Sequence, residues 1–344
     1  MIDRETSLIT YTLGNRRSLL FYLDRDSFEV FDLPPRAEIE SLATTFHHVV
    51  KSSRDVLARP MLAPSGSRLS EILLAPVAGR LRTNVKIVRD GSLHLVPFAA
   101  LPIPNANCLL IEGHRLTSIP SLSVLEYLER QPRRDLPGMI AIVAPDVPPG
   151  RLALDPRFPI LSNVQAEVDT ISSRAFDRQM TLLGRHATPR ALFSLPFKDV
   201  GILHIAAHGL VHSDLPELSA MILTDTKGQD DYLRLIDILG EDLPIPLVVL
   251  SACESGVGEI LHGEGSIGMP HAFLSAGASS VLASLWAVQD RATAEFMERF
   301  YAGLLDEQES PAEALRQAQL EFLANSSSEL AAPYFWAAFE LHGR

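Results

Sequence analysis

Two residues whose side chains can do nucleophilic chemistry, His208 and Cys253, each follow an apolar stretch of the sequence. His208 comes near the end of VGILHIAAHG, residues 200–209, and Cys253 comes at the end of PLVVLSAC, residues 246–253. Continuous apolar runs of this kind are typical of strands that are buried on both faces of a parallel sheet, and ligands bind beyond the carboxyl ends of such strands. The sequence therefore predicts that two neighbouring strands bring an imidazole and a thiol into one crevice.

An imidazole and a thiol that face each other in one crevice can cleave a peptide bond. Histidine acts as a general base that turns the thiol into a thiolate, and it then returns the proton to the leaving amine. Gly209 has no Cβ, so its N–H and that of Cys253 can form an oxyanion hole close to a substrate carbonyl. Taken alone, Cys253 also fits a buried core thiol and His208 a hydrogen-bonded polar residue, but their coincidence at two strand ends favours the functional interpretation.

The neighbouring histidines and the second cysteine have simpler interpretations. His204 is embedded in the same apolar run and is expected to be packed and hydrogen-bonded, and Cys108 in NANCLLIEG is expected in the core. His208 and His212 form an H-x-x-x-H pattern, which binds zinc when it lies on a helix. Because a glycine follows the first histidine and the segment has the pattern of a strand and a loop, we expect no metal site.

A glycine-rich motif, GEGSIG at residues 263–268, matches the pattern G-x-G-x-x-G of dinucleotide-binding proteins, and Asp290 lies near where a ribose-binding acid belongs. That fingerprint requires its first glycine directly after a strand, whereas here a long segment separates Cys253 from Gly263, and Pro270 interrupts the start of the helix. We therefore expect no cofactor. A nucleotide-binding oxidoreductase stays as an alternative that NAD binding would reveal.

The wider pattern predicts two parts with a boundary near residue 135. Residues 1–135 begin with alternating, strand-like segments around the turn at Gly14 and Asn15 and continue with helical periodicity. Residues 136–344 alternate strands with helices, which is the pattern of an α/β sheet with buried strands. In the first part we expect strands at 7–15, 17–26, 28–35 and 85–101 and helices at 36–54 and 65–81. In the second part we expect strands at 139–145, 200–209, 218–225, 247–253 and 279–288 and helices at 163–176, 232–240, 266–278, 291–308 and 311–325.

The composition excludes several classes of partner. A formal net charge of −12 and a pI near 5.4 argue against a protein that binds nucleic acid or lies on an anionic membrane, because both need concentrated lysine and arginine. No apolar run approaches the length of about 20 residues that spans a bilayer. Two cysteines do not make a disulfide framework, and the N-terminus lacks the features of a signal peptide. We expect a cytoplasmic protein whose partner is a protein or a small molecule.

Several segments, in their order along the chain, resemble the CHAT family of caspase-like cysteine peptidases: LHIAAHG, LSACESGVGE, HGEGSIGMPHAFLSAGASSVLASLWAVQD, MERFYAGL, EALRQAQ and PYFWAAFELHG, with DGSLHLVPFAAL and IPSLSVLEYL in the first part. The resemblance implies an α/β fold with a caspase-hemoglobinase-like sheet flanked by helices at 136–344. It implies that residues 1–135 form a smaller, non-catalytic α+β half that resembles a degenerate peptidase and helps to position substrate. It also implies a His-Cys dyad of His208 and Cys253 that hydrolyses peptide bonds.

The same segments are similar to separase, in which an LW-x-V-x-D stretch supplies an acid to the substrate pocket. The matching stretch here is LWAVQD, which ends at Asp290. An unpaired acid in a partly dry pocket favours Arg, and then Lys, before the cleaved bond. The alternative is that Asp290 caps the following helix, and both interpretations stay open. The resemblance further assigns Glu254, Ser284 and Trp286 to substrate binding.

The resemblance also suggests how the activity is used. CHAT domains usually follow helical repeats that sense a partner, and no such repeats are present here, so we expect an activating protein in trans or processing of the loops at 210–218 or 256–265. The leading hypothesis is an endopeptidase that acts on a protein substrate in a bacterial signalling, cell-death or defence pathway. The alternative is a catalytically silent caspase-like scaffold that binds protein partners.

Overall fold

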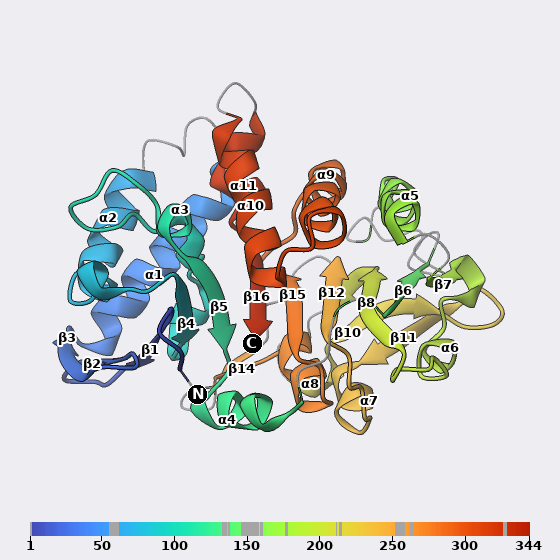
Figure 1. Ribbon diagram of the computed structural model, residues 1–344, viewed down its shortest axis with the longest axis horizontal. Coiled ribbons are helices and arrows are strands. Elements are labelled where there is room, and N and C mark those ends of the chain that lie inside the picture. Colours follow the sequence, from blue (N-terminus) through green and yellow to red (C-terminus); the bar gives the residue numbers. More distant parts are fainter. Residues whose placement is uncertain are drawn as a thin grey trace. The chain divides into compact units, whose positions relative to one another are not determined.

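The computed structural model describes residues 2–54, 62–132, 136, 138–145, 158, 161–175, 178–210, 212, 215–251, 259–261, 265–325 and 329–344. The chain divides into two compact units. Figure 1 labels their helices and strands. Unit 1 comprises residues 1–129, 260–266 and 315–344, and unit 2 comprises residues 130–259 and 267–314. The predicted boundary near residue 135 falls shortly after the first change of unit, and the roles predicted for the two halves stay predictions.

Unit 1 contains a mixed sheet that begins with the predicted antiparallel strands. Apolar and polar residues alternate in SLLFYL, with burial that follows the same alternation, and this is the pattern of a strand with one face on the core. The first three strands pair antiparallel in turn. The fourth strand pairs in parallel with the first, the fifth with the fourth, and the C-terminal strand with the fifth. The strand order is β3-β2-β1-β4-β5-β16, with β1 at Thr6–Thr12, β2 at Ser18–Leu23, β3 at Phe28–Leu33, β4 at Asn84–Val88, β5 at Arg115–Ile119 and β16 at Phe339–Gly343.

The helices of unit 1 present apolar stripes to its core. The two long N-terminal helices pack against each other, and the C-terminal segment is held by the buried Gln319, whose Nε2 donates to the carbonyl oxygens of Trp336 and Phe339. The α-helices are α1 (Arg36–Lys51), α2 (Leu62–Leu73), α3 (Leu110–Gly113), α4 (Leu122–Arg130), α11 (Pro333–Trp336) and, from residue 315 onwards, α10 (Pro311–Ala324). The short 3-10 turns are η2 (Ala78–Arg80), η3 (Gly91–Leu95), η4 (Phe98–Ala100) and η9 (Glu329–Ala331).

Unit 2 contains a parallel sheet with the strand order β15-β12-β8-β6-β7. The chain adds β7 on one side of β6 and then returns to add β8 on the other side, so the strand order reverses between β6 and β8. In α/β sheets, ligands bind at the carboxyl ends of the strands beside such a reversal. The strands are β6 (Met139–Ala144), β7 (Gln179–Leu183), β8 (Val200–Ala206), β12 (Leu247–Ser251) and β15 (Ser280–Ser284).

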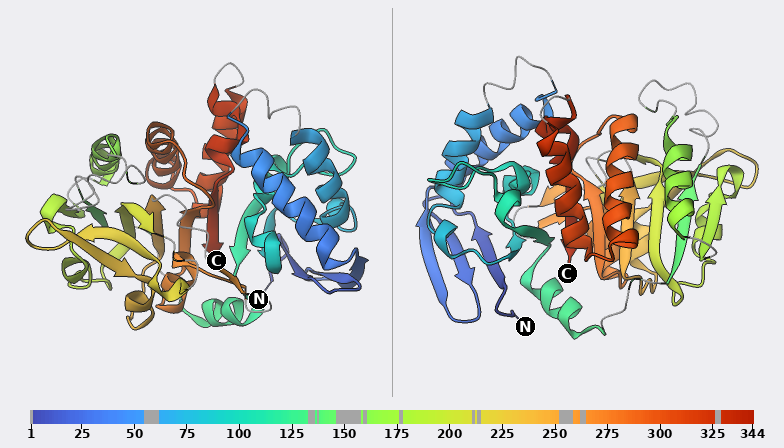
Figure 2. Two further views of the ribbon diagram at one scale, coloured as in Figure 1. Left: turned by 180° about the vertical axis from the view of Figure 1, so that it is seen from behind. Right: turned by 45° about the horizontal axis from the view of Figure 1, so that its top comes forward.

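Two long helices of unit 2, α5 (Val164–Ala175) and α9 (Asp290–Tyr301), lie side by side, and Figure 2 (right) shows them in front of the strands, α5 in green and α9 in orange. A small antiparallel sheet has the order β11-β10-β9, with β9 at His208–Leu210, β10 at Ala220–Thr224 and β11 at Asp230–Arg234. The remaining elements of unit 2 are α6 (Pro189–Leu192), α7 (Leu235–Leu239), α8 (Met269–Ser275), the 3-10 turns η6 (Gly184–His186) and η7 (Pro216–Leu218), and the π-helix η8 (Ala302–Asp306). Strands β13 (Glu259–Leu261) and β14 (Gly265–Ile267), most of whose residues belong to unit 1, pair with each other.

Four sequence expectations about local structure and burial are wrong. The helix expected at 65–81 ends at Leu73, and a 3-10 turn, η2, follows at Ala78–Arg80. The segment 232–240 begins as β11 and becomes helical only at Leu235, because pairing with β10 stabilises the extended form of its first residues. The strand expected at 85–101 ends at Val88, where the chain turns through η3 and η4, with Gly91 at a positive φ of 56°. Cys108 is half-buried and free, so it is not a core residue.

Among the helices of the described ranges, none is both long and apolar enough to cross a lipid bilayer.

Candidate active site

The candidate site begins with two neighbouring strands, β8 and β12, whose residues are all buried. They pair in parallel, with His204 opposite Val249 and Ala206 opposite Ser251. Parallel strands with apolar side chains on both faces form the centre of such a sheet, so their positions are fixed by packing from both sides. The prediction that these two apolar runs are neighbouring parallel strands is confirmed.

His208 lies two residues beyond the end of β8 and is 6% exposed. The prediction that it ends the long strand is wrong in detail, because the chain leaves the parallel sheet after Ala206 and His208 begins β9. There it pairs antiparallel with Ile222 of β10, while Gly209 pairs with Met221. The imidazole packs edge-on against the ring of Phe158, with centroids 5.5 Å apart and planes at 70°. His208 is therefore held just beyond the carboxyl end of β8.

The proposed nucleophile, Cys253, and the adjacent Glu254 lie outside the described residues. Ser251, two positions before Cys253 in the sequence, is the last residue of β12. The His-Cys pair and the oxyanion role of the Gly209 and Cys253 backbone stay predictions.

A buried polar network lies among the same strands, and the sequence predicts only part of it. The expectation that His204 is packed and hydrogen-bonded is confirmed, because it is fully buried and its Nδ1 lies 2.9 Å from the hydroxyl of Tyr301. Its Nε2 lies 3.0 Å from Oε1 of Glu167 on α5, and the hydroxyl of Ser251 donates to Oε2 of Glu167 at 3.1 Å. Burial, and then the charge of Glu167, raise the pKa of Tyr301 well above its usual range, so its hydroxyl stays neutral.

Sequence reasoning missed Glu167, although its position carries a signal. The buried residues of α5 include Val164, Val168 and Ile171, and Glu167 falls among them at helical spacing with 2% exposure. A carboxylate in an apolar helical stripe is rare unless it is paired, so this position indicates a buried partner.

Asp290, the predicted specificity residue, is the first residue of α9 and is half-buried. The N-cap position belongs to Gln289, which makes no side-chain capping bond. The Oδ2 of Asp290 accepts hydrogen bonds of 2.8 Å from both the backbone N–H and the side-chain Nδ2 of Asn163. The carboxylate is therefore partnered rather than unpaired, which removes the argument that burial alone demands a substrate cation.

The other predicted substrate residues lie in or just after β15. Ser284 ends this strand with 4% exposure, and the side chain of Trp286 is fully buried. His212, the second histidine of the H-x-x-x-H pattern, lies outside any helix, and its Nδ1 accepts a hydrogen bond from the N–H of Leu215. Residues 265–267 of the glycine-rich motif form β14, and Pro270 lies in the first turn of α8.

Comparison with solved structures identifies the fold. The chain is similar to separase in the Saccharomyces cerevisiae separase–securin complex, with a TM-score of 0.63, 12% identity, and coverage of 98% of this chain and 30% of that chain. It is also similar to the Arg-specific cysteine proteinase gingipain R, with a TM-score of 0.52, 10% identity, and coverage of 83% and 68%. At these identities the similarity shows the fold alone, and the predicted caspase-like α/β fold with a sheet flanked by helices is confirmed.

Comparison of sequences identifies relatives and a family. Tetratricopeptide repeat protein 28 of Homo sapiens is 25% identical over 368 residues that cover 88% of this chain, and the Mus musculus protein of the same name is 26% identical over 372 residues. This chain spans only 14% of the length of either relative. The CHAT domain matches residues 63–344, which is most of the sequence. The chain therefore belongs to the CHAT domain family.

Proposed function

We propose that this chain is a cysteine endopeptidase in which His208 and Cys253 form the catalytic pair. The observation that carries the proposal is the register of β8 and β12, in which Ala206 lies opposite Ser251. His208 follows Ala206 by two positions, and Cys253 follows Ser251 by two positions. Membership of the CHAT domain family, with folds similar to separase and gingipain, supports the same chemistry.

In the proposed reaction, the imidazole of His208 takes the thiol proton of Cys253, and the thiolate attacks the carbonyl carbon of the peptide bond. The backbone N–H groups of Gly209 and Cys253 stabilise the negative charge that develops on the carbonyl oxygen. The C–N bond then breaks as the imidazolium gives its proton to the leaving amine, which leaves a thioester. Water, deprotonated by the same imidazole, hydrolyses the thioester and restores the thiol.

Mutagenesis with matched controls tests this pair. We expect His208→Ala and Cys253→Ser to lower the rate of cleavage of a peptide library by about 1000-fold or more, because each removes a member of a unit that acts together. Cys108→Ser is the control for cysteine loss, since this thiol is half-buried in unit 1. His212→Ala is the control for histidine loss in the same segment. Both should cleave like the wild type.

The opposite result would identify the alternative function. If the wild type cuts no library member, and the wild type and Cys253→Ser capture protein partners equally well, the chain is the silent scaffold. Cleavage that survives Cys253→Ser at the wild-type rate rules out this nucleophile.

For specificity, we propose that Asp290 binds a basic side chain before the cleaved bond. Asn163 engages only Oδ2 through two donors, and no hydrogen bond from the described residues reaches Oδ1. A carboxylate held in this way has a fixed orientation with one oxygen available for a guanidinium or ammonium group. The solved gingipain R, of similar fold, is described as Arg-specific, which supports a basic preference in this site.

Steady-state kinetics with peptides that differ only before the cleaved bond test this role. We expect Asp290→Asn to lower kcat/KM for Arg peptides by about 30- to 1000-fold, which corresponds to about 2–4 kcal/mol for a lost charge pair. Glu295→Gln is the control on the same helix, because Glu295 pairs with Arg299 one turn away. A wild-type preference for acidic or apolar residues would refute the assignment, as would a change in melting temperature without a change in cleavage profile.

We propose that this activity is cytoplasmic and acts on a protein substrate of a signalling, cell-death or defence pathway. We propose that a second protein activates it in trans. The solved separase of similar fold is in complex with a second protein, securin, which supports a protein partner for this chain.

A further inference from the structure

We propose that Glu167 is a positioning residue that ties together the two strands carrying the candidate dyad. The inference rests on the proposed function, because it assigns Glu167 a role in aligning His208 with Cys253. Glu167 comes from α5, outside the two strands, and contacts both of them through its two carboxylate oxygens. We infer that its loss would change the reactivity of the Cys253 thiol as well as the stability of the fold.

The carboxylate makes one contact to each strand. On β8, Nε2 of His204 lies 3.0 Å from Oε1, a distance that makes an ion pair when the imidazole is protonated, although the contact is not a well-directed hydrogen bond. On β12, the hydroxyl of Ser251 donates a hydrogen bond of 3.1 Å to Oε2. The bridge therefore crosses the β8–β12 pair.

The register of the two strands explains why one side chain reaches both. His204 lies opposite Val249, and Ala206 lies opposite Ser251, so His204 and Ser251 belong to positions that point to the same face of the sheet. Glu167 on α5 and Tyr301 on α9 come from the two helices that pack side by side on that face. The four side chains thus form one network that joins two strands and two helices of unit 2.

Burial makes this network sensitive to small changes. His204 and Tyr301 are fully buried, and the residue exposures of Glu167 and Ser251 are 2% and 7%. In such a place a polar group that loses its partner keeps the full cost of desolvation, because water cannot replace the lost bond. The strands therefore keep the positions that satisfy the carboxylate, and these positions fix where each strand ends.

The strand ends are where the predicted chemistry begins. Ser251 precedes Cys253 by two residues, and His204 precedes His208 by four. A shift of the end of β12 relative to β8 would change the distance between imidazole and thiol, and a misplacement of about 1 Å can cost about 100-fold in rate. This role requires polar contact of the Glu167 side chain with both strands, through the hydrogen bond from Ser251 and the close approach to His204, rather than its negative charge as such.

The decisive variant is Ser251→Ala, which removes one arm of the bridge and only one oxygen atom from the core. Its control is Ser7→Ala in unit 1, since Ser7 is also buried and its hydroxyl also makes a 3.1 Å bond, as acceptor from the N–H of Arg82. Glu167→Gln tests rescue, because an amide can accept from Ser251 and donate to the imidazole of His204. Glu167→Ala removes the bridge completely.

The measurement is the rate at which iodoacetamide alkylates Cys253 in the intact chain between about pH 5 and pH 9, followed by mass spectrometry of the Cys253 peptide. It needs no substrate, and kcat and KM are measured in parallel. We expect Ser251→Ala to slow alkylation at neutral pH by about tenfold and to move its midpoint to higher pH, because an imidazole that no longer faces the thiol stabilises the thiolate less. Ser7→Ala should lower the melting temperature by a similar amount without moving this profile, and Glu167→Gln should stay within about threefold of the wild type.

The reference variant His208→Ala distinguishes failure of the proposed dyad from failure of the positioning role of Glu167. If it leaves the alkylation profile of Cys253 unchanged, the proposed dyad is wrong. If it changes the profile while Ser251→Ala behaves like Ser7→Ala, only the positioning role is overturned. A Glu167→Gln protein as slow as a folded Glu167→Ala protein would also overturn it, because the charge and not the hydrogen-bonded bridge would then control the thiol.

Discussion

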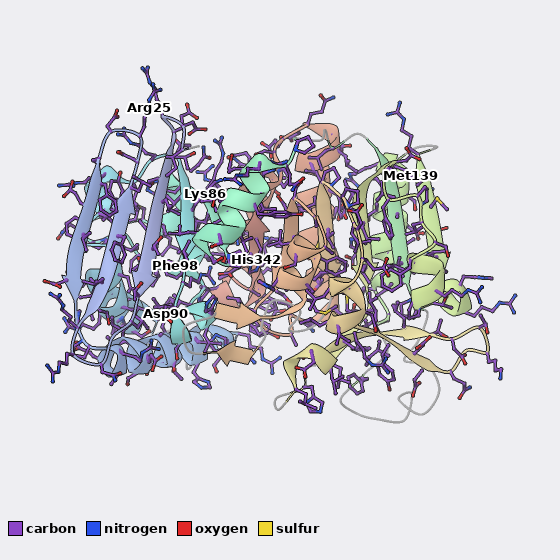
Figure 3. All side chains as sticks on the ribbon, turned by 90° about the horizontal axis from the view of Figure 1, so that it is seen from below. Arg25, Lys86, Asp90, Phe98, Met139 and His342 are labelled. Atoms are coloured by element: carbon purple, nitrogen blue, oxygen red, sulfur yellow. The ribbon has the colours of Figure 1, made fainter. Side chains whose placement is uncertain are left out.

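The buried ion pair of unit 1, between Arg89 and Glu340, gives a quantitative test of how this structure is held together. The guanidinium donates two hydrogen bonds of 2.8 Å to the two carboxylate oxygens, and the side chains are 4% and 9% exposed. The centroid of the ring of Phe98, labelled in Figure 3, lies 5.0 Å from the guanidinium carbon. Arg89→Met keeps most of the apolar volume but leaves a buried carboxylate without its cation. Because a buried charge that loses its partner typically costs about 3–5 kcal/mol, we expect a loss of stability in this range at pH 8.

The loss of stability caused by Arg89→Met should be larger at high pH than at low pH. Burial already raises the pKa of Glu340, with Arg89 acting against it. Without Arg89 the carboxyl group of the folded protein binds its proton at higher pH still, so the variant gains stability as the pH falls from 8 towards 5 and loses it as the pH rises. The difference from the wild type should therefore be smaller at pH 5 than at pH 8.

Urea unfolding at the two pH values measures these differences. Arg89→Met/Glu340→Leu, which removes both charges, should recover most of the loss, since replacement of a buried pair by apolar residues is often close to neutral. The control is Arg17→Met, because Arg17 pairs with Asp32 at 3.1 Å but both side chains are 68% exposed. We expect that control to lose less than about 1 kcal/mol. A similarly small loss for Arg89→Met, or a double variant no more stable than the single one, would refute the reasoning.

Three further predictions concern single positions. Burial, and then the guanidinium of Arg89, lower the pKa of His342 to about 3, so the folded state resists protonation and loses stability as the pH falls below the usual histidine pKa near 6.5. His342→Gln should reduce the loss of unfolding free energy between pH 7.5 and 5.5 by about 1 kcal/mol in urea unfolding. An unchanged dependence of stability on pH would contradict this. Thr188 caps α6 by accepting a hydrogen bond from the N–H of Ala191, so Thr188→Ala should lower the unfolding free energy by about 1 kcal/mol, and an unchanged urea midpoint would argue against the cap. Gly91 has a φ of 56°, and an added Cβ would lie 2.5 Å from Oε1 of Glu40, so Gly91→Ala should lower the melting temperature and cost about 1–2 kcal/mol, whereas equal stability would show that the turn adapts.

Local signals predict the fold where the pattern is long and regular. The alternation around Gly14 gives the hairpin of β1 and β2, and the continuous apolar runs give β6, β8 and β12. The sequence does not predict β7, because Gln179–Leu183 mixes polar and apolar residues and lacks the continuous apolar run of the neighbouring strands. The start of the segment expected to be helical at 232–240 is a strand instead, because its pairing with β10, which decides its conformation, is not visible in the segment itself.

The candidate site shows the same division between local and distant information. Strand ends and the family resemblance point to His208 and Cys253, since both signals lie in contiguous residues. The role of Glu167 depends on a partner 84 positions away, and that of Arg89 on one 251 positions away, so neither can be read from its own segment. Such residues can still be recognised in the sequence as charged residues at core positions, because a buried charge is stable only if another buried polar group faces it. In this chain Glu167 stands in the apolar stripe of α5, and the histidine that faces it, His204, stands inside the apolar strand β8. Complementary residues of this kind predict a contact between α5 and β8, on the face of the sheet that supports the proposed dyad.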